Sequence, residues 1–168
     1  MLGLGLAAGA HDAHAQQPDP TVEAFARYKA GVSLFRDGNA RAALIEFRRA
    51  YELSPDPNVL FNIGQCHISL QDYVVALDTL EKVLREGGDK LKPGNKEQAQ
   101  KDVETLKGRI ARLEITVNVP GAEISVDDSP VGKAPLDGPI TVSSGRRKVS
   151  AALEGRKPDT KHVDIGGG

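Results

Sequence analysis

An internal repeat of about 33 residues constrains this chain more than any other feature of its sequence. A small residue is followed, twelve positions later, by a second small residue and, four positions after that, by a large apolar residue. The two copies of this pattern are Gly31, Ala43 and Phe47, and Gly64, Ala76 and Leu80. Small residues let two helices approach closely, and a large apolar residue fills the space beside the contact. The sequence therefore predicts a stack of helix-turn-helix units, an architecture that binds partners more often than it catalyses reactions.

Both copies resemble the tetratricopeptide repeat. The first copy spans residues 24–56. Its residues at the positions that define the family are small, aromatic or aliphatic, turn-forming or proline, as the family requires: Gly31, Leu34, Gly38, Ala43, Phe47, Ala50 and Pro55. The second copy, residues 57–88, retains Leu60, Ile63, Gly64, Tyr73, Ala76 and Leu80. It departs from the family at His67, Val83 and Gly88, where an aromatic residue, an alanine and a proline are usual. The resemblance implies two helix pairs over residues 21–88, and the first helix of each pair would line a concave surface.

Residues that favour helix starts and turns lie where such pairs require them. The predicted capping residues are Asn39, Asp56 and Asp72, with Asp19 or Thr21 opening the first helix. Pro57 follows a capping carboxylate, a combination typical of the first helical turn. Gly38 supplies the turn between the two helices of the first repeat.

A third helical segment is predicted after the repeats. It follows a polar connector, residues 89–94, and its apolar residues recur at alternating spacings of four and three: Ala99, Val103, Leu106, Ile110 and Leu113. Asn95 and Gln98 resemble a capping box at its start. We expect a helix over residues 95–112 that covers the exposed end of the second repeat, within a connector and capping region of residues 89–112. The alternative is a dimerising coiled coil, for which fewer than about three heptads are available.

From Leu113 onward the apolar pattern alternates every second residue. A strand is expected over residues 113–119, ending at Pro120-Gly121. Further strands are expected at 122–126, 140–142, 148–153 and 161–165, separated by turn sequences at 127–130, 143–145 and 155–158. The expected fold class is therefore α+β with two domains: two repeats plus a capping helix, then a small antiparallel β-sandwich or open barrel over residues 113–165.

This second region resembles a PEGA domain, a small β-module of bacterial and archaeal envelope proteins. The resemblance rests on residues 119–127 (VPGAEISVD), 131–135 (VGKAP), 145–149 (GRRKV) and 154–158 (EGRKP). The chain departs from the family at Asp128, Arg147 and Arg156, where a glycine, a histidine and an aromatic residue are usual. Residues 166–168 are expected to begin a linker. Repeats of this kind followed by a PEGA module are familiar in envelope proteins of Gram-negative bacteria.

The first fifteen residues have the features of an incomplete signal peptide. Residues 2–10 form a short apolar run, and Ala13-His14-Ala15 has the form that signal peptidases accept, but a positively charged start is missing. The run is too short to span a membrane. Residues 16–20 would then be a linker, and the protein would be periplasmic or secreted. The alternative is an alanine-rich, disordered N-terminus.

Composition and charge argue against several functions. The formal net charge is -1, whereas proteins that bind nucleic acids carry a basic surface. Cys66 is the only cysteine, so no intrachain disulfide can form. Cys66 and His67 point about 100° apart on a helix, and no further ligand follows at metal spacing, so both are interpreted as packing residues.

Two charged clusters of the β region are also interpreted structurally. Asp127 and Asp128 are expected to be turn residues, and residues 146–148 to be the shoulder of a hairpin. The sequence contains no recognisable catalytic triad, acid–base pair, metal cluster or phosphate-binding glycine loop. The chain is therefore expected to be a non-enzyme that needs no cofactor.

The concave surface implied by the tetratricopeptide resemblance is the candidate binding site. It would expose Phe25, Tyr28, Val32, Phe35, Arg36, Asn58, Phe61, Asn62, Gln65 and Ser69. Asn62 matches the asparagine of peptide-carboxylate clamps in this family, but Tyr28 and Val32 stand where such a clamp carries its basic residue. The resemblance therefore implies a peptide or protein partner without a defined C-terminal carboxylate.

Together these features predict a non-catalytic interaction or scaffold protein of the bacterial cell envelope. The repeats would provide a groove for a peptide or protein partner, and the β-module would attach the protein to the envelope or act as a spacer. Two alternatives stay open. The β-module could bind a cell-wall polymer or surface layer in a structural protein, or the chain could be the extracytoplasmic part of a larger membrane-anchored regulator.

Overall fold

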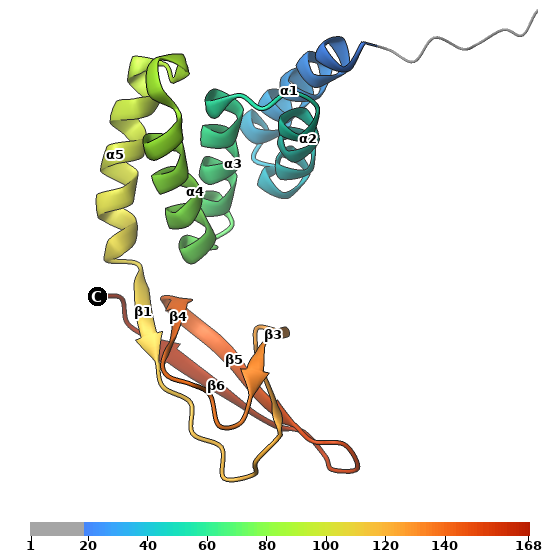
Figure 1. The fold of residues 1–168 in the computed structure, drawn as a ribbon, viewed down its shortest axis with the longest axis vertical. Helices are drawn as coiled ribbons and strands as arrows, with labels where there is room; N and C mark the ends of the chain where they lie inside the picture. Colours follow the sequence, from blue (N-terminus) through green and yellow to red (C-terminus); the bar gives the residue numbers. More distant parts are fainter. Residues whose placement is uncertain (1–18) are drawn as a thin grey trace, which may run out of the picture.

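A computed structural model describes residues 19–168 as five α-helices followed by two antiparallel β-sheets (Figure 1). The helices are α1 (Pro20–Arg36), α2 (Ala40–Leu53), α3 (Pro57–Ser69), α4 (Tyr73–Glu86) and α5 (Pro93–Lys107), with a short 3-10 helix, η1 (Gly88–Lys90), before α5. This arrangement confirms the α+β class and the order of a helical part before a β part. The predicted signal peptide, residues 1–15, lies outside the described residues.

The two helix pairs are built around equivalent glycine contacts. A Cβ atom added to Gly31 on α1 would lie 2.7 Å from Cδ1 of Phe47 on α2. A Cβ atom added to Gly64 on α3 would lie 2.6 Å from Cδ2 of Leu80 on α4. Both distances are shorter than carbon atoms tolerate, so each helix contact depends on the absence of a side chain. The structure therefore confirms that the two sequence copies form equivalent helix pairs.

The helical core is continuous from the first pair to α5. Ala43, Ala76, Leu80 and Val83 are completely buried. The buried residues of α5 are Ala99, Val103 and Leu106, and they belong to the same core. Helix α5 packs beside the second pair, since α4 and α5 are in contact and share this core.

The ends of α5 differ from the prediction. The helix starts at Pro93, whose fixed φ suits a first helical turn, and its N-cap is Lys92 without a side-chain bond. The expected capping box is wrong, because the amide of Asn95 donates to the Asn58 side chain instead. The helix also ends at Lys107, five residues earlier than expected, because residues 110–113 pair with another strand.

Three of the predicted N-caps are confirmed. The side chain of Asp19 accepts a hydrogen bond from the backbone of residue 21 at 2.8 Å, and Asn39 and Asp56 cap α2 and α3 in the same way. Asp72 occupies the N-cap position of α4 but makes no capping bond. Its carboxylate lies 3.3 Å from Nδ1 of His67 instead.

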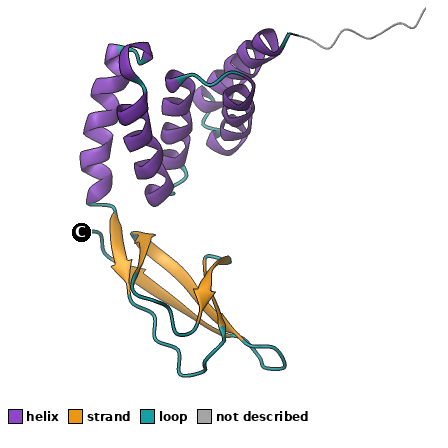
Figure 2. Ribbon diagram, viewed as in Figure 1, coloured by secondary structure: helices purple, strands orange, loops and turns teal. Residues whose placement is uncertain are grey.

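The β part contains six strands in two sheets (Figure 2). One sheet pairs β1 (Ile110–Leu113) with β4 (Ile140–Ser143). The other has the order β3-β2-β5-β6, formed by β3 (Ser129–Lys133), β2 (Glu123–Val126), β5 (Gly145–Ala152) and β6 (Asp159–Ile165). Its core is small: the buried cluster consists of Ala122, Ile124 and Ala134, with half-buried apolar neighbours around it.

The expected strand at residues 113–119 is wrong in its pairing, although its alternation is present. Paired strand is confined to Ile110–Leu113, while Ile115 and Val117 are half-buried and their neighbours Glu114, Thr116 and Asn118 are exposed. The ladder stops at the pair of Leu113 with Ile140, because the next partner would be Pro139, which has no N–H to donate.

Strand β3 was not expected, because Pro130 and Gly132 both disfavour strands. It is an outer strand with an irregular register, which is where a sheet tolerates these residues. The turn before it confirms the prediction for Asp127 and Asp128, which adopt positive φ values of 49° and 64°. Two such residues between paired strands make the tight hairpin turn that the twist of a sheet favours.

The helical part and the β part meet at a narrow junction. The backbone N–H of Val74 on α4 donates to the Ser143 hydroxyl at 3.3 Å. The guanidinium of Arg109 lies 5.8 Å from the centre of the Tyr73 ring. After β6, the last strand in the sequence, the chain returns to this junction. There the N–H of Gly168 donates to the carbonyl of Ile110.

Candidate functional site

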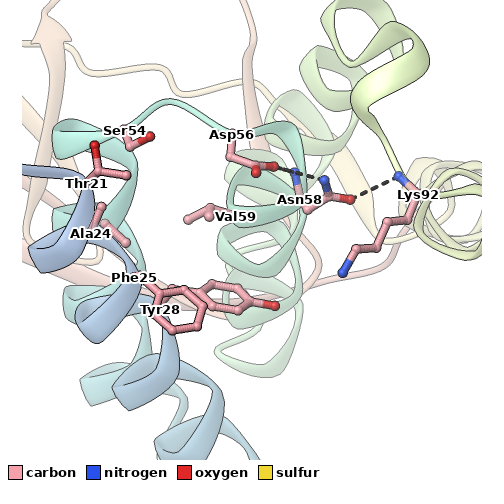
Figure 3. A pocket seen from close by; sticks show the side chains of 10 residues that line it. Thr21, Ala24, Phe25, Tyr28, Ser54, Asp56, Asn58, Val59 and Lys92 are labelled. Carbon is pink, nitrogen blue, oxygen red and sulfur yellow. Dashed lines mark hydrogen bonds between the residues drawn. The ribbon is translucent and has the colours of Figure 1, made fainter.

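A groove of about 280 Å³ opens between α1 and the beginning of α3 (Figure 3). Ala24, Phe25, Tyr28 and Val59 form its apolar wall. Phe25 leaves 63% of its surface exposed, whereas Ala24 and Val59 are buried. The groove therefore presents one large, accessible aromatic ring above an apolar floor, which is the usual composition of a small binding pocket.

The two aromatic rings of the groove have different roles. The Tyr28 ring packs against Phe47, with ring centres 5.9 Å apart and a tilt of 51°. Tyr28 is thus partly a core residue. Phe25 makes no such aromatic contact in the described chain, but the ammonium of Lys29 lies 5.7 Å from the centre of its ring. Of the two, Phe25 is the ring available to a partner.

The polar end of the groove is organised by Asn58. Its side-chain oxygen accepts hydrogen bonds from the backbone N–H of Lys92 and from the amide of Asn95, both at 3.0 Å. Its side-chain nitrogen donates to the carboxylate of Asp56 and to the carbonyl of Lys90, both at 2.9 Å. Figure 3 shows the bonds of Asn58 with Asp56 and Lys92, and the latter joins the start of α3 to the connector before α5. All the hydrogen-bonding capacity of this amide is used, so Asn58 braces the groove and has no capacity left for a ligand.

Three of the ten predicted binding residues line this groove: Phe25, Tyr28 and Asn58. Val32, Phe35 and Arg36 are exposed on the second half of α1, outside the groove. Asn62 is half-buried and Ser69 is exposed on α3, and neither lines this groove.

The expected exposure of Phe61 is wrong. Phe61 is 8% exposed and belongs to the helical core. One helical turn further on, the amide of Gln65 donates to the carboxylate of Asp102 on α5 at 2.6 Å. Because α5 lies beside this part of α3, it occupies the side of the second repeat that the prediction left open.

Seven residues that line the groove were not among the predicted binding residues: Thr21, Ala24, Ala50, Ser54, Asp56, Val59 and Lys92. Val59 and Ala24 are apolar residues that the repeat pattern assigned no surface role, and Lys92 comes from the connector. For Ala24 and Val59, apolar character was the only sequence feature that could have indicated a place in the groove. Nothing in the sequence around Lys92 indicates that the connector folds back beside α3.

The Cys66-His67 pair is part of the helical core, as expected for packing residues. The Arg48 guanidinium donates to Nε2 of His67 at 3.3 Å, so Nδ1 carries the ring proton and donates to Asp72. Cys66 is completely buried, and burial raises the pKa of its thiol to about 11. This shift disfavours the thiolate that nucleophilic attack or metal ligation requires. Within residues 19–168, no group of three histidine, cysteine, aspartate or glutamate side chains is placed to hold a metal ion.

Comparison with known proteins adds no relative. No protein-family model matches the chain, and no curated protein matches its sequence. Among the described helices, none is both long enough and apolar enough to cross a membrane.

Proposed function

We propose that the helical part is a tetratricopeptide-type platform in a non-catalytic interaction or scaffold protein, and that the groove between α1 and α3 binds a peptide segment of a protein partner. The equivalent contacts of Gly31 with Phe47 and of Gly64 with Leu80 support the repeat assignment. By the same proposal, the β part is a PEGA-like module that attaches the protein to the bacterial cell envelope or acts as a spacer. The signal-like residues 1–15 support a periplasmic or secreted location.

The exposed ring of Phe25 is the observation that carries this proposal. A phenylalanine with 63% of its surface in water, beside a groove with an apolar floor, retains apolar area that a partner would bury. The volume of about 280 Å³ is at the lower end of the range for small-ligand pockets, so the groove suits one or two side chains of a peptide. Lys92 and Asp56 stand at its polar end, where they would contact the polar backbone or charges of the peptide.

The proposal is tested with peptides selected on the full chain from a random display library. Phe25→Ala should weaken binding of a selected peptide by at least about 1 kcal/mol in calorimetry, while the melting temperature stays unchanged. Phe35→Ala is the matched control, because Phe35 is an exposed phenylalanine of the same helix outside the groove. Equal effects of the two substitutions would refute the groove as the binding site.

Tyr28→Ala separates binding from stability. This ring packs against Phe47, so its removal should lower the melting temperature as well as the affinity. A selected peptide whose affinity depends on Phe35 but not on Phe25 would place the site on the second half of α1 and contradict the proposal.

A further inference from the structure

The β part has an open side between residues 113–119 and the hairpin of β5 and β6. A hollow of about 210 Å³ is lined by residues from both, and a second hollow of about 520 Å³ continues toward the turn after β5. Thr116, Val117, Ala151, Asp159 and Lys161 line both hollows, so the two adjoin. Together they form one long depression, which we call the strand groove.

One wall of the strand groove is formed by residues 114–118, whose backbone groups are not paired with any strand that the structure describes. Within the described chain, the N–H and carbonyl groups of residues 114–118 form no backbone hydrogen bonds, although Leu113 immediately before them is paired with β4. The burial of their side chains nevertheless alternates as in a strand. These residues therefore continue β1 in strand-like form, and their backbone is open to an added strand.

The opposite wall carries charges that face inward. In the larger sheet, Ala151 on β5 lies opposite Ile124 on one neighbouring strand and opposite Asp159 on the other. Val149, two residues before Ala151 and therefore on the same face, lies opposite Lys161. Residues directly opposite one another point to the same face, so Asp159 and Lys161 share the face of the buried Ile124. Inward charges on an outer strand disfavour pairing with apolar strands.

The charges of the strand groove are mainly positive. Arg156, Lys157 and Lys161 line it, against the two carboxylates of Glu114 and Asp159, and all three cations and Asp159 lie along the larger hollow. None of these three cations forms a salt bridge with another residue of the described chain. A strand that carries carboxylates would meet these cations, whereas a basic strand would be repelled.

We propose that an extended acidic peptide adds to the β1-β4 sheet along residues 114–118, with its carboxylates facing Arg156, Lys157 and Lys161. The free backbone groups supply the main-chain bonds, and the cations select acidic over apolar or basic strands. This site is separate from the groove between α1 and α3, and it gives the β part a binding role of its own.

The test uses the full chain and an eight-residue peptide of alternating valine and glutamate. Binding should slow amide hydrogen exchange at every second residue within 114–118, because successive N–H groups of a strand point to opposite edges, and the same peptide with lysine in place of glutamate should not bind. A peptide with an N-methyl group on every residue keeps the charges but cannot donate main-chain bonds from either edge. Equal binding of the N-methylated peptide would overturn the proposal.

Charge reversal supplies the second arm. Arg156→Glu and Lys161→Glu should each weaken binding at least about fivefold. Lys133→Glu on β3 changes the net charge equally but lies outside the strand groove, and Phe25→Ala lies in the helical groove; both should leave binding unchanged. Arg156 lies in a turn, so Arg156→Glu should not disturb the fold. A normal melting temperature of this variant would exclude unfolding as the cause of weaker peptide binding.

Polygalacturonate, a carboxylate polymer without a peptide backbone, tests the alternative that the strand groove binds any polyanion. Competition by this polymer as strong as that of the peptide, with no protection within residues 114–118, would identify a polyanion site and overturn strand addition.

Discussion

The helical part and the β part of this chain close their cores in different ways. In the helical part, a small residue on one helix meets a large residue on the next, and Phe47 and Leu80 are almost completely buried as a result. In the β part only Ala122, Ile124 and Ala134 form the buried cluster, and hollows remain on both sides of residues 114–117. Repetition of a complementary pair produces dense packing, whereas short strands interrupted by prolines leave a backbone open. We therefore expect most of the stability to come from the helical part and more adaptability from the β part.

The largest expected effect compares one buried residue from each part. Phe47→Ala should destabilise the helical part by about 3 to 5 kcal/mol, because it leaves a cavity in a densely packed region. Ile124→Ala should cost less, about 2 kcal/mol, because its surroundings already border a hollow and can relax. Denaturant titration gives both values, and reaction of Cys66 with a thiol reagent reports opening of the helical part alone, since this thiol is buried.

The comparison breaks down if Ile124→Ala exposes Cys66 as much as Phe47→Ala does. That result would show that the two parts unfold as one cooperative unit.

A smaller effect is expected from overpacking the helix contact. Gly31→Leu should cost about 1 to 3 kcal/mol, because even a Cβ atom would lie 2.7 Å from the Phe47 ring. Arg41→Ala, at an exposed position of α2, should change stability by no more than about 0.5 kcal/mol. Thermal melts that show the same change for both variants would remove the repeat assignment.

The β part should respond to acid through Asp127. Partial burial alone would raise the pKa of this carboxyl, but hydrogen bonds from the Lys148 backbone and the Arg147 guanidinium hold it below its ordinary value. A lowered pKa means that the stabilisation is present above about pH 4 and is lost as pH falls through the lowered value. Asp127→Asn should therefore cost about 1 kcal/mol at pH 7 and progressively less in acid.

Asp128→Asn is the matched control for this measurement. Asp128 lies in the same turn, and its carboxylate meets only the exposed ammonium of Lys148, so its replacement should have a smaller effect. Asparagine tolerates positive φ at both positions, so the backbone conformation is not changed. The melting temperature of Asp127→Asn is compared with that of the unsubstituted chain at pH 7 and at pH 3. An equal loss at both pH values would contradict a stabilising role of the ionised Asp127 carboxylate.

The smallest effect is expected at the junction. Ser143→Ala removes the hydroxyl that accepts from the Val74 N–H, and this N–H lies in the first turn of α4, where water can replace the partner. The cost should not exceed about 1 kcal/mol in either part. A loss above about 2 kcal/mol in a thermal melt would show that the two parts depend on each other for folding.

The sequence predicted the helical part well because its contacts are local and repeat. The spacing of Gly31 and Phe47 was enough to identify the first helix pair, and the second pair followed from the period. The β part was predicted less well, because strand limits depend on distant partners. Nothing near Leu113 in the sequence shows that its ladder ends opposite Pro139.

The candidate site was predicted only in part. Phe25 was identified because the resemblance to a repeat family places it on the inner surface. Phe61 was misplaced, because the burial of one repeat depends on what covers it, and α5 covers α3 more closely than expected. The role of Asn58 as a brace depends on Lys92 and Asn95, more than 30 positions away, and no local pattern records such a contact.

The bond between the Gly168 N–H and the Ile110 carbonyl places the two ends of the β part side by side. A segment whose ends meet can be grafted into a surface loop of an unrelated protein without pulling its host apart. The β part is thus geometrically suited to transplantation. A host that carries this segment would show whether the strand groove forms without the helices that accompany it in this chain.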